Sequence, residues 1–410
     1  MNFSSPAFSV LAHRNFRNFL IARFFTTFTM MMMSVAVGCQ VYDLTKSPFA
    51  LGIVGLAQFL PAFLLTLPGG LAADRFERRK VILFGVSLEL SVALALLTIS
   101  LSASPKVGII FAVLTLIGAG RAFLAPAAQS LLPLLVPKAD FVRAVAWNSS
   151  MFQAACIAGP AVGGVLYLLG PVYVYGCGTA CLLTASLLFA TVKIPVVVRT
   201  NSSTRIADLF TGVKYVFSRQ AILGAVSLDL FAVLFGGATA LLPIYASDIL
   251  HTGPWGLGLL RSAPAVGAAV VALYLAHHPI REKAGLKLFS YVALFGLCTI
   301  AFGVSRSFSL SMAALVVLGA ADMYSVVIRQ TLVQISTPDA MRGRVSAVNL
   351  LFIGASNELG EFESGATAAW FGTEWAVVVG GLGTLAVVAI WAWRFPVLRK
   401  MNRLDVPQTI

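Results

Sequence analysis

Two residues of opposite charge, Arg121 and Asp322, lie near the middle of long apolar segments, at 107–132 and 308–333. A charged side chain at the centre of a bilayer costs at least about 2.5–3.5 kcal/mol, so such residues usually pair or face a water-filled cavity. Asp322 could bind a proton or a cationic group, and Arg121 an anionic group. We expect a breakable ion pair between them; a permanent pair that only holds two halves of the chain together is the alternative.

Two further carboxylates, Asp229 and Glu358, are candidates for the same chemistry. Asp229 lies in the first half of the apolar segment 220–245, where a polar residue near the membrane surface is the alternative interpretation. Glu358 is the deepest of three glutamates in the segment 345–370. Three ionised carboxylates so close together would repel, so at least one should be protonated or paired. We favour Glu358 for proton coupling within this group.

The elements that must position these residues are membrane-spanning helices. Hydrophobic residues make up 59% of the 410 residues and charged residues only 11%, a balance that excludes a water-soluble fold. Roughly twenty consecutive apolar residues cross a bilayer as a helix, and only helices or closed barrels satisfy the backbone there. The sequence predicts an all-α integral membrane protein with twelve transmembrane helices, at 19–41, 48–73, 81–101, 107–132, 144–169, 171–192, 220–245, 255–276, 286–304, 308–333, 345–370 and 375–394.

The chain also contains an internal repeat. Residues 114–164 align without a gap on residues 315–365 with 13 identities, and the alignment places Arg121 on Asp322. The informative identities are Gln129 with Gln330, Pro137 with Pro338, Arg143 with Arg344, and Asn148 with Asn349. A repeat of this length in an apolar chain predicts two related six-helix bundles with a binding site where they meet. We place the bundles at 1–193 and 220–410, and a cytoplasmic linker at 194–219.

The distribution of Lys and Arg predicts the orientation of the spans. With the N-terminus inside, 22 of the 29 basic residues lie on the cytoplasmic side, three lie on the other side and four lie within spans. Such an asymmetry places both termini in the cytoplasm of a multi-pass protein of the cell membrane, the inner or plasma membrane. Two of the four, Arg261 and Arg329, lie near the ends of their spans and are interpreted as interface anchors. The net charge of +13 sits in short clusters, which argues against nucleic-acid binding.

The joint between the second and third spans, 69–80, reads GGLAADRFERRK. A signal that keeps this loop in the cytoplasm would explain its cations but not Asp74 or the spacing. The pattern G-x-x-x-D-R-x-x-R-R resembles the signature loop of the major facilitator superfamily, with Glu77 at a position that is usually Gly. The resemblance implies a two-bundle fold and a carboxylate that docks on the N-terminal end of the eleventh helix. The implied conformational latch consists of Gly70, Asp74, Arg75, Arg78 and Arg79.

The fifth span holds a second pattern, A-x-x-x-G-P-x-x-G-G, at 155–164. Small residues at this spacing let two helices approach closely, and a proline permits a bend. Ordinary small-residue packing is the alternative. The pattern resembles that of drug and proton antiporters in the same superfamily, with Ala155 where Gly is usual. The resemblance implies a hinge or seal between helices 5 and 8, formed by Gly159, Pro160, Gly163 and Gly164.

Three further stretches, at 41–61, 120–133 and 341–349, resemble the branch of the superfamily that holds siderophore exporters and macrolide efflux proteins. The resemblance implies a secondary active exporter of small molecules, of the siderophore or drug class, that works by alternating access as a functional monomer. A G-x-x-x-x-G-K-[ST] loop is absent, so ATP is not the energy source and no cofactor is expected. Proton antiport is the expected driving force. An uptake permease or a uniporter for a small metabolite is the alternative.

The sequence argues against an enzyme or a metal site within the membrane. The four histidines lie in tails or joints and the five cysteines lie inside apolar segments, so neither residue type forms a catalytic or zinc-binding pattern. We therefore expect a non-enzymatic protein whose partners are its small-molecule substrate and the lipid bilayer.

Overall fold

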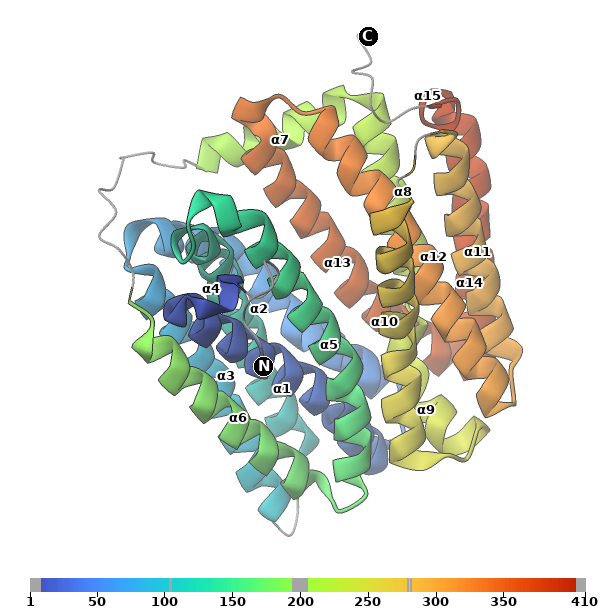
Figure 1. Cartoon of the computed structure of the whole chain (residues 1–410). Helices are drawn as coiled ribbons and strands as arrows, with labels where there is room; N and C mark the ends of the chain where they lie inside the picture. Colours follow the sequence, from blue (N-terminus) through green and yellow to red (C-terminus); the bar gives the residue numbers. More distant parts are fainter. Residues whose placement is uncertain (1–8, 103–104, 194–205, 279, 281, 403–410) are drawn as a thin grey trace. The chain divides into compact units, whose positions relative to one another are not determined.

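The computed structural model describes residues 9–102, 105–193, 206–278, 280 and 282–402, and the described chain is almost entirely helical (Figure 1). The α-helices of the first half are α1 (Arg14–Thr45), α2 (Pro48–Arg75), α3 (Arg78–Leu101), α4 (Val107–Leu131), α5 (Phe141–Tyr167) and α6 (Pro171–Thr191). Short 3-10 turns lie at Ser9–Ala12, Leu132–Leu134 and Lys138–Asp140.

The second half begins with the short helix α7 (Ile206–Ser218), within the predicted linker. It continues with α8 (Gln220–Phe235), η4 (Ala238–Leu241), α9 (Leu242–Ile244), η5 (Tyr245–Ile249), α10 (Gly253–His277), α11 (Ala284–Val304), α12 (Phe308–Ile335), α13 (Asp339–Phe371), α14 (Thr373–Arg394) and α15 (Pro396–Arg399). Tyr215 of α7 donates a hydrogen bond to the carbonyl oxygen of Ser336 at 2.7 Å, which ties this helix to the end of α12.

Within the described residues, eleven helical stretches are long and apolar enough to cross a membrane. The 33-residue α13 is long enough but is not among them, because it carries Asn349, Asn357 and three glutamates. The predicted span at 345–370 lies inside this helix. Polar groups in a helix of this length need partners from neighbouring helices.

The seventh stretch, Gln220–Ile249, is not a continuous α-helix. The helix α8 ends at Phe235, and the chain passes through a 3-10 turn and a single α-turn into a five-residue π-helix at Tyr245–Ile249. The break falls at two consecutive glycines, Gly236 and Gly237, which disfavour a helix interior. Gly237 also approaches the backbone of Gly360 so closely that an added Cβ would lie 2.7 Å from it. The break is therefore packed against α13.

The chain forms two compact units. Unit 1 comprises Met1–Thr45 and Ala57–Ser202, and unit 2 comprises Lys46–Leu56 and Ser203–Ile410. The segment 46–56 groups with unit 2 because Gly52 lets α2 approach the backbone of Gly365 in α13. A Cβ on Gly52 would lie 3.3 Å from the Cα atom of Gly365.

The two units repeat the same helix contacts. In unit 1, α1 packs against α5 and α6, and α3 packs against α4 and α6. In unit 2, α8 packs against α13 and α14, and α11 packs against α12 and α14. The pairs α4 with α2 and α12 with α10 also correspond, each with a glycine of one helix against the backbone of the other. The sequence repeat that aligns 114–164 with 315–365 thus relates α4 and α5 to α12 and α13.

The glycines of α5 permit close packing against α1 within unit 1. An added Cβ on Gly159 would lie 2.7 Å from the Cβ of Met31, and one on Gly163 would lie 2.6 Å from the carbonyl oxygen of Met32. With Pro160 and Gly164, both glycines are buried. This is the small-residue packing named above as the alternative, while the hinge or seal toward helix 8 stays a prediction.

Replacing Gly163 with alanine should destabilise unit 1, because the new methyl group meets backbone atoms that cannot rotate away. We expect a loss of about 1–3 kcal/mol, seen as a lower midpoint of thermal unfolding in detergent. Gly176 of α6 is the matched control, because no atom lies within 4 Å of its added Cβ. Equal midpoints for Gly163→Ala and Gly176→Ala would contradict the packing described here.

Candidate functional site

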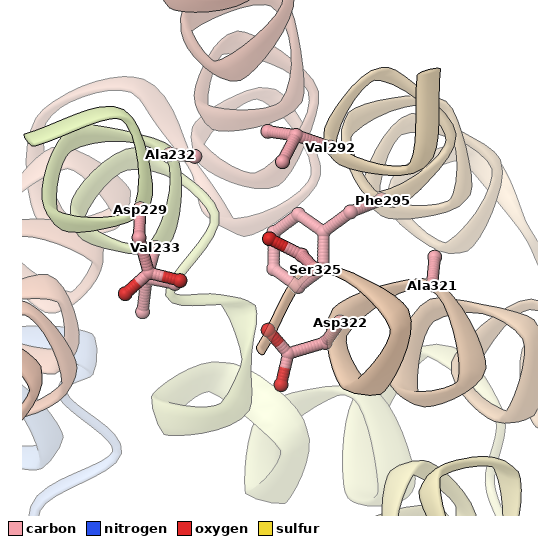
Figure 2. Close-up of a pocket in the computed structure, with 8 residues that line it drawn as sticks. All are labelled: Asp229, Ala232, Val233, Val292, Phe295, Ala321, Asp322 and Ser325. Carbon is pink, nitrogen blue, oxygen red and sulfur yellow. The ribbon is translucent and has the colours of Figure 1, made fainter. Parts of the chain in front are cut away.

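A small pocket inside unit 2 brings two of the predicted site residues together (Figure 2). It lies among α8, α11 and α12 and has room for about one water molecule. Its lining residues are Asp229, Ala232, Val233, Val292, Phe295, Ala321, Asp322 and Ser325. A pocket of this size can hold a proton-bearing group or a single small ion, but not a drug or siderophore.

The carboxylate of Asp229 is held by a buried ion pair. Its Oδ2 atom lies 3.2 Å from Nη2 of Arg329, and the side chains of the two residues are 8% and 2% exposed. Arg329 also donates a hydrogen bond from Nη1 to Oδ1 of Asn349 at 3.1 Å. The guanidinium group of Arg329 therefore contacts both α8 and α13. Its Nε has no hydrogen-bond partner among the described residues.

Asp322 lies in the same electrostatic environment without a direct ion pair of its own. It lies two turns before Arg329 on α12, and it interacts electrostatically with both Asp229 and Arg329. Figure 2 shows the oxygens of Asp229, Asp322 and Ser325 turned toward one space. The cluster thus contains two acidic groups and one cation, with Asp229 and Arg329 buried and Asp322 half-buried.

The interpretation of Arg329 as an interface anchor is wrong. Its side chain is almost completely buried, and it forms an ion pair with Asp229 of α8. The position of Arg329 near the end of its own span does not reveal this partner, because the partner lies on another helix. The other predicted anchor, Arg261, is 22% exposed and lies 4.0 Å from the carboxylate of Glu361, so it too points to a partner in the protein. A signal for Arg329 was present, since residues seven apart lie on one helical face and Asp322 precedes Arg329 by that spacing.

Two other residues of the pocket region were missed by sequence reasoning. Ser325 lies one turn after Asp322 on α12, and Asn349 occupies a position that is identical in the two copies of the repeat. A serine and an asparagine in apolar helices carry little signal by themselves. The identity of Asn148 and Asn349 was the available indication, but it did not show that Asn349 binds an arginine.

The remaining cavity candidates lie elsewhere. Arg121 of α4 belongs to unit 1, where it interacts electrostatically with Glu89 of α3, a residue that is only 7% exposed. The lining of the pocket does not include Glu358, which is part of α13. Arg121 and Asp322 belong to different units, so the pairing between them stays a prediction.

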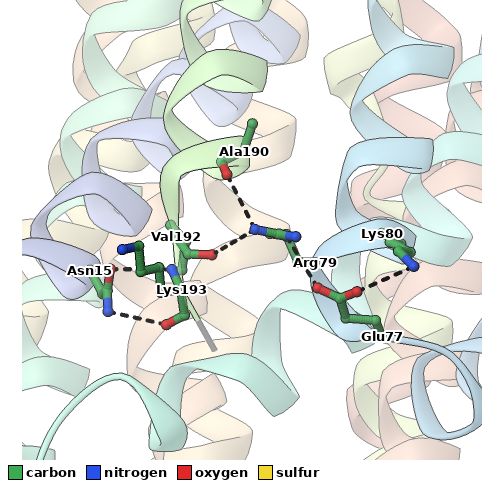
Figure 3. A network of polar contacts seen from close by, with 7 residues as sticks. All are labelled: Asn15, Glu77, Arg79, Lys80, Ala190, Val192 and Lys193. Atoms are coloured by element: carbon green, nitrogen blue, oxygen red, sulfur yellow. Dashed lines mark hydrogen bonds and ion pairs between the residues drawn. The ribbon is translucent and has the colours of Figure 1, made fainter. Parts of the chain in front are cut away.

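The basic loop after α2 makes contacts within unit 1 (Figure 3). Arg79 donates hydrogen bonds to the carbonyl oxygens of Ala190 and Val192, at 3.3 and 3.4 Å, and its Nε lies 3.2 Å from the carboxylate of Glu77. A cation is favoured at the C-terminal end of a helix, here α6. Glu77, which stands at a position that is usually Gly, thus orients Arg79.

The other predicted latch residues differ in their exposure. Arg75 is exposed and Arg78 is half-buried, and an added Cβ on Gly70 would meet no atom within 4 Å. The side chain of Asp74 lies outside the described part of the structure. The docking of this carboxylate on α13 therefore stays a prediction.

Comparison with known proteins identifies the family. The family model described as transmembrane secretion effector matches residues 5–408. This chain belongs to the transmembrane secretion effector family of the major facilitator superfamily. The predicted resemblance and the all-helical membrane fold are thereby confirmed.

Curated relatives of this chain include proteins named as exporters. The chain is 28% identical to the enterobactin exporter EntS of Citrobacter koseri over 346 residues, which cover 82% of this chain and 81% of that protein. It is 26% identical to the enterobactin exporter EntS of Escherichia coli O1:K1, with the same coverage.

Solved structures share the fold. A bacterial homologue of the human lysosomal transporter Spinster, in an inward-facing and occupied conformation, aligns with a TM-score of 0.73 at 15% identity, over 97% of this chain and 99% of that chain. A D-xylose–proton symporter aligns with a TM-score of 0.69 at 14% identity, over 95% of this chain and 98% of that chain. These likenesses show the fold. The family match and the apolar helices together show a multi-pass membrane protein of a transporter family.

Replacing Arg329 with methionine should destabilise unit 2, because it leaves the carboxylate of Asp229 buried without a partner. Breaking a buried pair in this way costs about 3–5 kcal/mol, so thermal unfolding in detergent should begin at a clearly lower temperature. The double variant Asp229→Asn with Arg329→Met should recover much of that loss, since no unpaired charge remains.

The surface pair of Arg306 and Glu374 provides the control for this experiment. Their side chains are 76% and 42% exposed, so Arg306→Met should change stability by less than about 1 kcal/mol. Equal unfolding temperatures for Arg329→Met and Arg306→Met would contradict the expected cost of leaving Asp229 buried without a partner.

Proposed function

We propose that this protein is a secondary active exporter of small molecules, driven by proton antiport. The observation that carries the proposal is the pocket in unit 2, where two carboxylates, Asp229 and Asp322, share one cation, Arg329. Ionisable residues inside a membrane are costly, and in transporters they commonly serve as proton relays. The pocket is too small for the substrate, so a proton is the occupant that its size and charge favour.

The relatives support export and suggest the class of substrate. The curated proteins that match most of the chain are named enterobactin exporters, so a siderophore is the first candidate. Arg121 in α4 suits such a molecule if the substrate is anionic, because a guanidinium binds carboxylates and phenolates through charge-assisted hydrogen bonds. Drug-like molecules such as macrolides form the second candidate class.

The transport cycle follows from the two-unit architecture. We propose that the bundles at 1–193 and 220–410 rock against each other around a central site, while the segment 194–219 links them in the cytoplasm. The excess of basic residues on one side of the spans supports two cytoplasmic termini in the inner membrane. Asp74, with Gly70, Arg75, Arg78 and Arg79, would latch the cytoplasmic side in one state, and the small residues at 159–164 would act as a hinge or seal. The protein would function as a monomer.

Transport in proteoliposomes tests the function directly. When a pH gradient drives protons across the membrane in one direction, purified protein should move enterobactin in the other direction, against the concentration gradient of enterobactin. Dissipating the pH gradient should abolish that accumulation. A macrolide is tested in parallel. Movement of a substrate that does not respond to the pH gradient would establish a uniporter, and movement of neither molecule would refute the proposed substrate classes.

The direction of transport is tested in the organism that carries the gene. Deletion of the gene should lower the secreted siderophore and raise its cellular content, because an exporter removes it from the cytoplasm. A lower cellular content after deletion would show uptake instead.

Replacing Arg121 with alanine should impair transport of an anionic siderophore more than transport of a neutral macrolide. A charge-assisted contact contributes about 1.5–3 kcal/mol, which corresponds to a roughly tenfold or greater rise in the substrate concentration at half-maximal rate. The exposed Arg306, replaced with alanine, is the control for loss of a cation alone. An equal effect of Arg121→Ala on both substrates would exclude a role in binding the anion.

A further inference from the structure

The acidic pocket of unit 2 contains two carboxylates, but only one cation, Arg329, interacts with them among the described residues. Asp229 and Asp322 lie beside a single guanidinium, that of Arg329, so the fully ionised cluster carries a net negative charge. Burying an uncompensated charge is strongly unfavourable. A small cation must therefore bind whenever the cluster is shielded from water, and the question is which oxygen atoms bind it.

Asp229 is already committed to a partner. Its ion pair with Arg329 at 3.2 Å is buried, and Asn349 fixes the same guanidinium from α13. Asp322, in contrast, makes no direct hydrogen bond or ion pair in the part of the chain that the structure describes. The charged groups that act on it are Asp229 from α8 and Arg329 from α12, while α11 contributes only Val292 and Phe295 to the pocket. Asp322 is therefore the carboxylate available for exchange.

Ser325 provides a second, independent indication of a ligand. This residue is 3% exposed, lines the same pocket one turn from Asp322, and its Oγ has no hydrogen-bond partner among the described residues. Figure 2 shows this hydroxyl turned into the space that the carboxylates face. A hydroxyl can accept a hydrogen bond from a protonated carboxyl group and donate one to an ionised carboxylate. Ser325 can thus serve both protonation states of a neighbouring acid.

The pocket favours a proton over a metal ion. Hard metal cations require several oxygen ligands, typically six or more for calcium and magnesium. Apart from the two carboxylates and Ser325, the lining side chains are Ala, Val and Phe, which offer no oxygen atoms. The space also holds only about one water molecule. A carboxylate that takes up a proton needs neither further ligands nor further room.

We propose that Asp322 and Ser325 form the site that binds and releases the coupling proton. Arg329 and Asn349 are positioning residues, because they hold Asp229 as an ionised partner that does not take up the proton. This inference deepens the proton antiport proposed above and rests on it. An O–H bond forms on a carboxylate oxygen of Asp322 when a proton arrives from water, and the same bond breaks when the proton returns to water on the other side. No electrons are transferred. Asp229 remains ionised and paired throughout.

Infrared difference spectroscopy of the purified protein tests the site without a substrate. The spectrum between acidic and alkaline buffer should contain the C=O stretch of a protonated carboxyl group, and Asp322→Asn should remove that band. Ser325→Ala should retain the band but shift it to higher frequency, because the protonated group loses its hydrogen-bond acceptor. Ser325→Ala also keeps the carboxylate, so the test does not depend on the folding of one variant.

The same unit offers matched controls. Glu363→Gln removes a carboxylate of α13 that accepts a hydrogen bond from Thr367 at 2.8 Å, and Ser309→Ala removes an exposed hydroxyl of α12. Both should leave the band that Asp322→Asn removes unchanged. A band that survives Asp322→Asn, or one that moves when Na⁺ replaces choline at constant pH, would overturn the proposal. An unshifted band in Ser325→Ala would overturn the role of the serine.

Transport then separates this inference from the function on which it rests. In proteoliposomes, Asp322→Asn should lose accumulation of enterobactin or the macrolide driven by a pH gradient, while exchange across the membrane without a gradient continues. Gradient-driven accumulation by both the wild type and Asp322→Asn would refute the site and leave antiport intact. A wild-type protein that ignores the pH gradient, yet loses its infrared band in Asp322→Asn, would refute antiport and leave the proton site standing.

Discussion

The cost of a charge in a low-dielectric interior is the constraint that organises unit 2. It explains why Arg329 reaches across to Asp229 and why Asn349 engages the same guanidinium. Exposed pairs such as that of Arg306 with Glu374 meet no comparable requirement, because water already solvates both groups. The buried pair, together with Asn349, thereby joins α8, α12 and α13.

The pocket lies close to the break in the helix that contains Asp229. Asp229, Ala232 and Val233 belong to the last part of α8, directly before the break at Gly236 and Gly237. Discontinuous helices in other transporters place ion sites next to such breaks. In this protein the break is packed on Gly360 of α13, the helix that also contributes Asn349.

The two copies of the repeat share their packing but not their polar chemistry. Corresponding helix pairs meet in both units, and glycines bring several of these pairs into backbone contact. Arg121 in unit 1 lies near Glu89, whereas Asp322 at the equivalent position lies near Asp229 and Arg329. Packing thus preserves the architecture of the duplicated unit, and the buried charges distinguish the two copies. This difference supports our proposal that unit 2 binds the coupling proton and that Arg121 of unit 1 contacts the substrate.

The sequence by itself determined the membrane environment, the helical spans and the family, because these depend on composition, segment length and local motifs. It also identified Asp229 and Asp322 as costly charges that require an explanation. Only the tertiary structure decided that these two carboxylates share one pocket, and that Arg329 is the buried partner of Asp229 instead of an anchor at the membrane surface. The reason is that a buried charge is neutralised by an opposite charge close to it in space, which can come from any part of the chain. Asp229 and Asn349 approach Arg329 from α8 and α13, and no pattern along α12 records that arrangement.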